Sequence, residues 1–133
     1  DVVDAIEIQH SNGKNRLAIE RVVSGDSVVE LFSVDEVQAE DKLFRKLYQL
    51  FIGLLADGEL PIADRQSVLS VKPEVQIHYF TNTPKVSEIS ITLSPYNRQF
   101  YAAIRDGVPE FLVSREQVDR LLQGLINYMT TSD

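Results

Sequence analysis

The chain has 133 residues, which fits one domain of ordinary size. Hydrophobic residues make up 44% and charged residues 25%, so the composition is that of a globular protein and excludes a disordered or fibrous one. Its 13 Lys and Arg against 20 Asp and Glu give a net charge of -7, which argues against a nucleic acid or an anionic membrane as the main partner. Cysteine is absent, which excludes disulfides, thiolate metal sites and cysteine nucleophiles. No apolar run is long enough for a membrane span, so we expect no direct membrane insertion by this chain.

Period-two alternation predicts three antiparallel strands in the first part of the chain. The first strand spans Val3–His10, the second ends near Val23, and the third spans Ser27–Val34. Asn12–Gly13, a dipeptide that favours tight hairpin turns, separates the first two strands. The apolar residues then recur at helical spacing, which predicts one buried helix from about Ala39 to Asp57.

The candidate metal ligands of the chain lack the spacing that metal ions require. Four carboxylates crowd the front of the first predicted helix, where we expect them to complement the macrodipole: Asp35, Glu36, Glu40 and Asp41. A calcium site is the alternative, but the alternating D-x-D-x-D loop and its turn glycine are missing. The two histidines, His10 and His78, lie on separate predicted strands without the spacing of zinc ligands. The sequence therefore predicts no metal site and no cofactor.

The second part of the chain repeats the order of strands followed by a helix. Residues 58–72 have no clear period and predict a connection. Alternation predicts four strands, in residues 74–80, 89–93, 100–104 and 110–113. Asp106–Gly107 is a second hairpin dipeptide. The pattern Ser114 to Gln117 is a capping box, in which the Ser hydroxyl and the Gln side chain satisfy each other's backbone donors, and one apolar stripe predicts a helix from there to Met129.

Segregated strands and helices predict an α+β fold, with an antiparallel sheet packed with two amphipathic helices. We expect two meander-plus-helix units, βββα in residues 1–57 and ββββα in residues 73–129, joined by the connection at 58–72. Both units belong to one domain of residues 1–133.

Motifs of catalysis are missing from the sequence. It holds no G-x-S-x-G elbow and no glycine-rich phosphate loop, and its serines lie mostly in predicted turns or at a helix cap. We therefore expect no enzyme. A hydrolase with a carboxylate pair stays open as an alternative, because a chain with twenty acidic residues always offers some pair for acid–base work.

The predicted hairpin around residues 94–101 gathers three aromatic residues and one arginine. Tyr96 lies at the turn, and alternation places Tyr101 and Arg105 on the face opposite Phe100, Ala102 and Ile104. Exposed aromatic and arginine side chains are common anchors of protein and glycan contacts. The candidate partner-binding residues are therefore Tyr96, Arg98 and Tyr101. In the alternative interpretation, Tyr96 folds over the edge of the core and Tyr101 covers a cross-strand neighbour.

The run from Pro73 to Leu122 resembles the repeat of the bacterial domain of unknown function 4340. The positions that carry the resemblance are a proline before a strand, a Tyr, Gly and Val across the next hairpin, and an apolar helix start: Pro73, Tyr101, Gly107, Val113, Val118, Leu121 and Leu122. The helix from Leu50 to Asp57 also looks like a helix of that family, so the resemblance covers most of residues 38–126.

The resemblance implies a location rather than a reaction. Proteins similar to this one are typically held to the outer face of a bacterial membrane by an N-terminal span or a lipid anchor. We therefore expect an extracytoplasmic protein, anchored through a segment before Asp1. The family has no established catalytic residues, so none are carried over.

We expect a non-catalytic binding or interaction module of the bacterial cell envelope, whose partner is an envelope protein or a wall polymer. Two alternatives remain open, a hydrolase with an unrecognised carboxylate site and a purely structural spacer.

Overall fold

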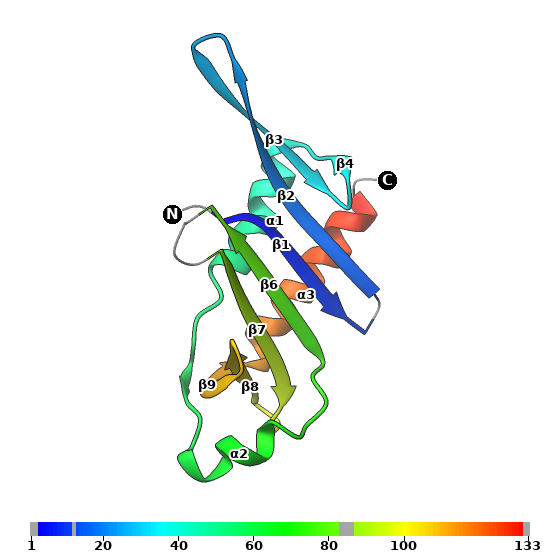
Figure 1. Cartoon of the computed structure of the whole chain (residues 1–133). Coiled ribbons are helices and arrows are strands. Elements are labelled where there is room, and N and C mark those ends of the chain that lie inside the picture. Colours follow the sequence, from blue (N-terminus) through cyan, green and yellow to red (C-terminus); the bar gives the residue numbers. More distant parts are fainter. Residues whose placement is uncertain (1–2, 12, 83–86, 132–133) are drawn as a thin grey trace.

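One antiparallel sheet is the framework of the molecule (Figure 1). The structure, a computed structural model, describes residues 3–11, 13–82 and 87–131. The strands are β1 Val3–His10, β2 Gly13–Ser24, β3 Ser27–Val34, β4 Val37–Gln38, β5 Gly58–Glu59, β6 Val75–Thr81, β7 Glu88–Pro95, β8 Phe100–Arg105 and β9 Val108–Ser114. Their order across the sheet is β4-β3-β2-β1-β6-β7-β8-β9-β5, and every neighbouring pair is antiparallel.

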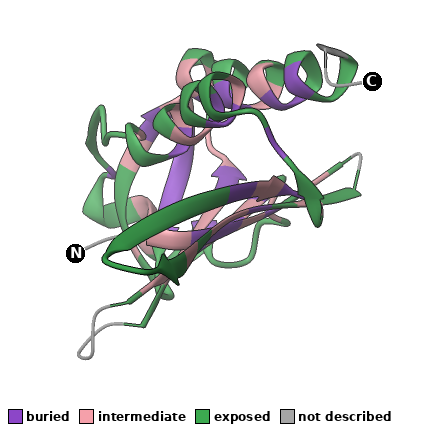
Figure 2. Ribbon diagram, turned by 90° about the horizontal axis from the view of Figure 1, so that it is seen from above, coloured by how far each residue is buried: buried purple, intermediate pink, exposed green. Residues whose placement is uncertain are grey.

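Two helices, α1 (Asp41–Ile52) and α3 (Arg115–Thr131), cover one face of this sheet. Figure 2 shows the two layers from above, with the buried residues between them. Burial of this apolar face is the main stabilising contribution. The predicted α+β class is therefore confirmed. Within the described residues, no helix combines the length and the apolar character needed to cross a bilayer.

The connection at residues 58–72 is more structured than its sequence predicts. It supplies the edge strand β5, a 3-10 turn (Ile62–Asp64) and the short helix α2 (Arg65–Val68). These elements cover the other face of the sheet near β8 and β9, where Leu60 and Val68 pack with Ala102 in a small second core. Leu60 and Ala102 are both fully buried there.

The strands of both halves belong to one sheet, because β1 pairs with β6. Ile6 lies opposite Tyr79, and Ile8 lies opposite Ile77. The edge strands β4 and β5 are absent from the sequence prediction. The structure thus supports one sheet with two covering helices, and it gives no support to the finer division into βββα and ββββα units.

The start of α1 differs from the prediction. The helix begins at Asp41, after Glu40, and ends at Ile52 instead of continuing to Asp57. Asp35 and Glu36 do not precede the helix directly but form the turn between β3 and β4, where both have positive φ angles, 52° and 70°. The Asp35 carboxylate stabilises this left-handed turn, because it accepts hydrogen bonds of 2.8 Å from the Asn15 amide and from the Arg16 backbone N–H.

The predicted hairpin turn at Asp106–Gly107 is confirmed. Both residues have positive φ angles, 50° and 86°, and they join Arg105 to its cross-strand partner Val108. In the other predicted hairpin dipeptide, Asn12 lies outside the described residues.

Half of the predicted capping box is confirmed. The Ser114 hydroxyl accepts a hydrogen bond of 3.1 Å from the Gln117 backbone N–H, as expected at a helix start. The predicted reciprocal bond, from the Ser114 backbone N–H to the Gln117 side chain, does not form. The Ser114 N–H donates to the Asp57 carboxylate at 2.7 Å instead. The Gln117 amide donates to the Leu55 carbonyl and to Asp57. The segment after α1 is thereby tied to the first turn of α3.

We predict that Ser114→Ala lowers the free energy of unfolding by about 1 kcal/mol, because a cap hydroxyl satisfies a free backbone donor of the helix. Urea denaturation followed by circular dichroism measures this change. Ser70→Ala is the matched control, because Ser70 is exposed and caps no helix start. Equal unfolding midpoints for both variants and the wild type would contradict the capping role of Ser114.

Candidate functional site

The structure separates the three residues that the sequence predicts as partner-binding. Tyr101 is only 5% exposed, so the expectation that it lies on an exposed face is wrong. The predicted alternation with Ala102 is correct, but the face that carries Tyr101 is the one that the helices cover. The Tyr101 hydroxyl donates to the Glu74 carboxylate at 2.7 Å, and the Arg115 guanidinium lies 4.5 Å from the centre of its ring.

Tyr96 is half-buried and its hydroxyl donates to the Asp64 carboxylate. Its ring packs against the small second core under α2, which agrees with the alternative interpretation that Tyr96 folds over the edge of a core. Arg98 is exposed at the tip of the hairpin. Of the three predicted residues, Arg98 alone is exposed, so they do not form one continuous surface.

Burial and the neighbouring Glu74 carboxylate raise the pKa of the Tyr101 phenol from its ordinary value of 10.0 to about 12. The folded protein therefore holds this proton more tightly than the unfolded chain does. The resulting stabilisation is complete below pH 10 and is lost as the pH rises towards 12.

We predict that Tyr101→Phe loses less stability than the wild type between pH 10 and pH 12, because the variant has no phenol to ionise at this position. Urea denaturation at a series of pH values measures the difference. A variant whose stability falls as steeply as that of the wild type in this window would contradict the assignment.

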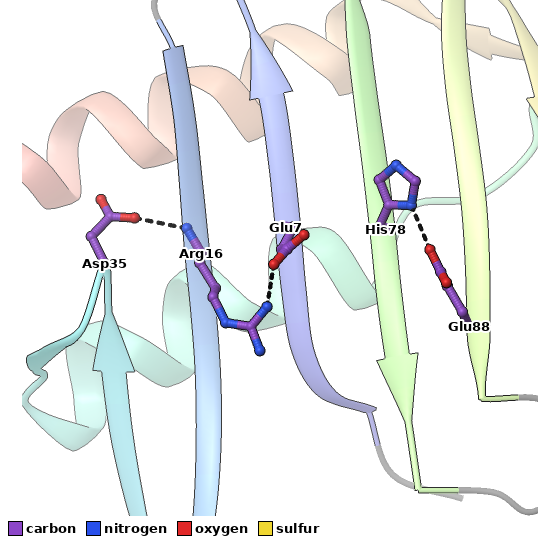
Figure 3. A network of polar contacts seen from close by, with 5 residues as sticks. All are labelled: Glu7, Arg16, Asp35, His78 and Glu88. Atoms are coloured by element: carbon purple, nitrogen blue, oxygen red, sulfur yellow. Dashed lines mark hydrogen bonds and ion pairs between the residues drawn. The ribbon is translucent and has the colours of Figure 1, made fainter.

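The sheet face opposite α1 and α3 is not covered by a helix over its four central strands, β2, β1, β6 and β7 (Figure 2). One row of residues crosses these strands in register, from Arg16 through Glu7 and His78 to Ser90. Arg16 and Glu7 form an ion pair, and the His78 ring nitrogen Nδ1 lies 2.8 Å from the Glu88 carboxylate (Figure 3). Arg16, Glu7 and His78 of this row therefore each have a side-chain partner within the protein.

The next row across the same strands has a different character. It runs from Lys14 through Gln9 and Gln76 to Thr92, each residue directly opposite its neighbour. Within the described part of the chain, these four side chains make no hydrogen bond or ion pair. We call this row the Gln9–Gln76 row. Two neighbouring amides, each with donors and an acceptor, are thus available to a ligand.

Two open hollows meet at the Gln9–Gln76 row. One, of about 400 Å³, lies over the row that begins at Arg16 and Glu7. Its lining includes Glu7, Gln9, Arg16, Asp35 and His78. The other, of about 730 Å³, lies where β1 ends and β6 begins. Its lining includes Gln9, Ser11, Lys72, Glu74 and Gln76. Gln9 borders both, so the two hollows meet at this row, and the larger hollow also has an apolar lining from Pro73, Val75, Pro95 and Leu122.

The two acidic residues that line the smaller hollow have partners within the protein. Glu7 and Asp35 both line the smaller hollow, but each already has its own partner, Arg16 for Glu7 and the Asn15 amide for Asp35. The His10 ring nitrogen Nε2 lies 2.8 Å from the other end of that Asn15 amide. These contacts connect the turn of β3 and β4 to the end of β1. Among the described residues, no group of three or more His, Asp or Glu side chains could hold a metal ion.

Sequence reasoning missed this polar surface. Its local signal was present, since Gln9 and Gln76 occupy the polar positions of two alternating segments. Their proximity depends on the pairing of β1 with β6, which lie far apart in the chain. The two histidines have the ordinary places that their sequence context indicates, His78 on the open face and His10 at the end of β1.

Comparisons with known proteins add no further information, because no family model, no curated protein and no solved structure matches the chain. The resemblance to the bacterial domain of unknown function 4340 therefore stays a prediction.

Proposed function

We propose that the protein is a non-catalytic binding module of the bacterial cell envelope, and that the Gln9–Gln76 row and its two hollows bind a neutral polymer rich in hydroxyl and amide groups, such as a wall glycan. One observation carries this proposal: four polar side chains without a protein partner lie in register beside open hollows. Binding sites of this kind use a few polar groups to orient a ligand.

Charge favours a neutral ligand over a charged one. The net charge of -7 repels polyanions, and two carboxylates beside the row already have cationic or imidazole partners, Glu7 in Arg16 and Glu88 in His78. Lys14 is the one member of the row that carries a charge, and it repels cations. A cationic polymer would have to compete with Arg16 and His78 for these carboxylates. A neutral ligand needs only hydrogen-bonding partners, which Gln9 and Gln76 supply.

The dimensions of the row suit an extended chain. Neighbouring strands lie about 4.8 Å apart, so the row from Lys14 to Thr92 spans roughly 14 Å across four strands. A polymer lying across the strands meets one polar side chain at each strand. Repeated contacts of this kind add hydrogen bonds without requiring a deep pocket.

The cellular location in this proposal rests on the family resemblance alone, which implies a protein held at the outer face of a bacterial membrane. Wall glycan is available to a protein in that location. An envelope protein with an extended, amide-rich segment would offer similar hydrogen-bonding groups, and it is the second candidate partner.

We predict that the double variant Gln9→Ala with Gln76→Ala binds soluble, neutral fragments of bacterial wall glycan about thirtyfold more weakly than the wild type, because it loses two hydrogen bonds that contribute about 1 kcal/mol each. Isothermal titration calorimetry measures the affinity, and unfolding curves verify that the variant is folded. Gln123→Ala is the matched control, since this exposed amide lies on α3, in the layer that covers the other face.

Equal affinity in the wild type and the double variant, or no binding by either, would reject the Gln9–Gln76 row as a glycan site. Chromatography of the fragments after incubation with the protein tests the alternative function at the same time. Shortened fragments would identify a hydrolase and would contradict the non-catalytic proposal.

A further inference from the structure

The hairpin of β2 and β3 extends as an arm beyond the rest of the molecule (Figure 1). This arm carries an unusual concentration of exposed aliphatic side chains. The exposed fractions are 38% for Val22, 75% for Val23, 61% for Val28, 44% for Val29 and 41% for Leu31. Grouped apolar exposure of this kind marks an interaction surface more often than scattered single residues do.

The root of the arm is braced against the body of the protein. Arg21 of β2 forms ion pairs with Asp4 of β1 and with Glu30 of β3, and Arg45 of α1 lies 3.7 Å from the same Glu30 carboxylate. Tyr48 of α1 donates a hydrogen bond to the backbone of Val3 beside this cluster. The arm is therefore held in one orientation, which lowers the entropic cost of a contact made by its tip.

The outer edge of β3 lacks a neighbouring strand along most of its length. β4 pairs with β3 only at Ser33 and Val34, and the Ala39 N–H bonds to the Phe32 carbonyl. The five residues from Ser27 to Leu31 pair with β2 on their inner side, but on the outer side no strand of the described part of the chain lies beside them. This segment contains neither Lys nor Pro, which proteins commonly place on exposed edges to prevent strand pairing.

We propose that the partner of this edge is a second copy of the same chain, whose β3 pairs antiparallel with β3 around a two-fold axis at Val29. This inference goes beyond the glycan-binding proposal and does not depend on it. The resulting dimer continues the sheet from one molecule into the other.

Backbone geometry determines which registers are possible. The Phe32 carbonyl faces outward, as its bond to Ala39 shows, and outward-facing residues alternate along a strand, so Glu30 and Val28 also face outward. An axis at Val29 places Val28 opposite the partner's Glu30 and uses all five free residues. An axis at Val28 would pair only residues 27–29 with their copies. An axis at Glu30 would pair only residues 29–31, and it would place two Glu30 carboxylates directly opposite each other.

The side chains agree with an axis at Val29. On the open face, Val22 and Val29 lie side by side in register, so the dimer forms a row of four valines with the partner's Val29 and the partner's Val22. On the other face, the pair of Arg21 and Glu30 stays intact beside the partner's Val28. No like charges meet directly, and the valine row loses contact with water.

This contact is small compared with a standard protein interface, so we expect a weak dimer that forms as the protein concentration rises. The pairing also closes on itself, because each copy uses its free β3 edge once. The assembly therefore ends at two chains.

Single cysteines test the register directly, because the natural chain contains none. Val29→Cys places two cysteines opposite each other at a non-hydrogen-bonded position, where the Cα atoms lie about 4.5 Å apart, within the range that a disulfide can bridge. We expect this variant to form a covalent dimer under mild oxidation. Val23→Cys is the matched control, because it is the most exposed valine of the arm but lies several strands from its copy in this register. The control should form no covalent dimer.

Sedimentation velocity from micromolar to millimolar protein concentration provides the second readout. We expect dimers for the wild type and for Val23→Lys, and monomers for Val29→Lys, because two lysines would face each other at the axis. Monomeric wild type throughout, failure of Val29→Cys to cross-link, or equal cross-linking of Val23→Cys would overturn the proposal. The glycan-binding variant, Gln9→Ala with Gln76→Ala, should dimerise like the wild type, which separates the two proposals.

Discussion

The pairing of β1 with β6 is the constraint on which the rest of the structure depends. It joins two halves of the chain into one sheet and brings Ile6 and Ile8 next to Tyr79 and Ile77 in the centre of the core. Neither half would otherwise have a partner along this edge, and exposed edges carry a row of unsatisfied backbone groups. The same pairing places Gln9 directly opposite Gln76 on the other face. One set of backbone hydrogen bonds therefore builds both the core and the candidate binding surface.

The two long helices cover only one face of the sheet, and this explains why its polar and apolar side chains lie on opposite faces. Both long helices pack on the face that carries the aliphatic residues, which leaves the opposite side chains of the central strands to pair with one another or with a ligand. At one end the connection through α2 covers this second face and builds a small core around Ala102. At the other end β2 and β3 continue past the helices, so their valines have no cover from the same chain. The two proposed contacts thus use the polar centre and the apolar extremity of one sheet.

Local patterns predicted much of the fold, because alternation, helical spacing and turn dipeptides act within a few residues of one another. The Ser114 cap and the Asp106–Gly107 turn are confirmed for this reason. The errors arise where contacts between segments far apart in the sequence determine the burial or the hydrogen-bond partner of a residue. Alternation placed Tyr101 on the correct side of its strand, but only the packing of the helices determines that this side is buried. Asp57, far from Ser114 in sequence, takes the bond expected of Gln117. The Gln9–Gln76 row was beyond prediction, since its two halves come together through strand pairing alone.

The tyrosine hydroxyls connect separate layers of the molecule, and this makes them a set of internal optical probes. Tyr48 bonds to the backbone of Val3, and Tyr79 bonds to the backbone of Phe51 at the end of α1. Tyr96 and Tyr101 bond to carboxylates on other segments. Because the chain has no tryptophan, its near-ultraviolet absorbance and emission come mainly from its five tyrosines, which are these four and Tyr128. Changes at the helix layer, at the α2 connection and at the centre of the sheet can therefore be followed separately, with single Tyr→Phe variants and no added dye.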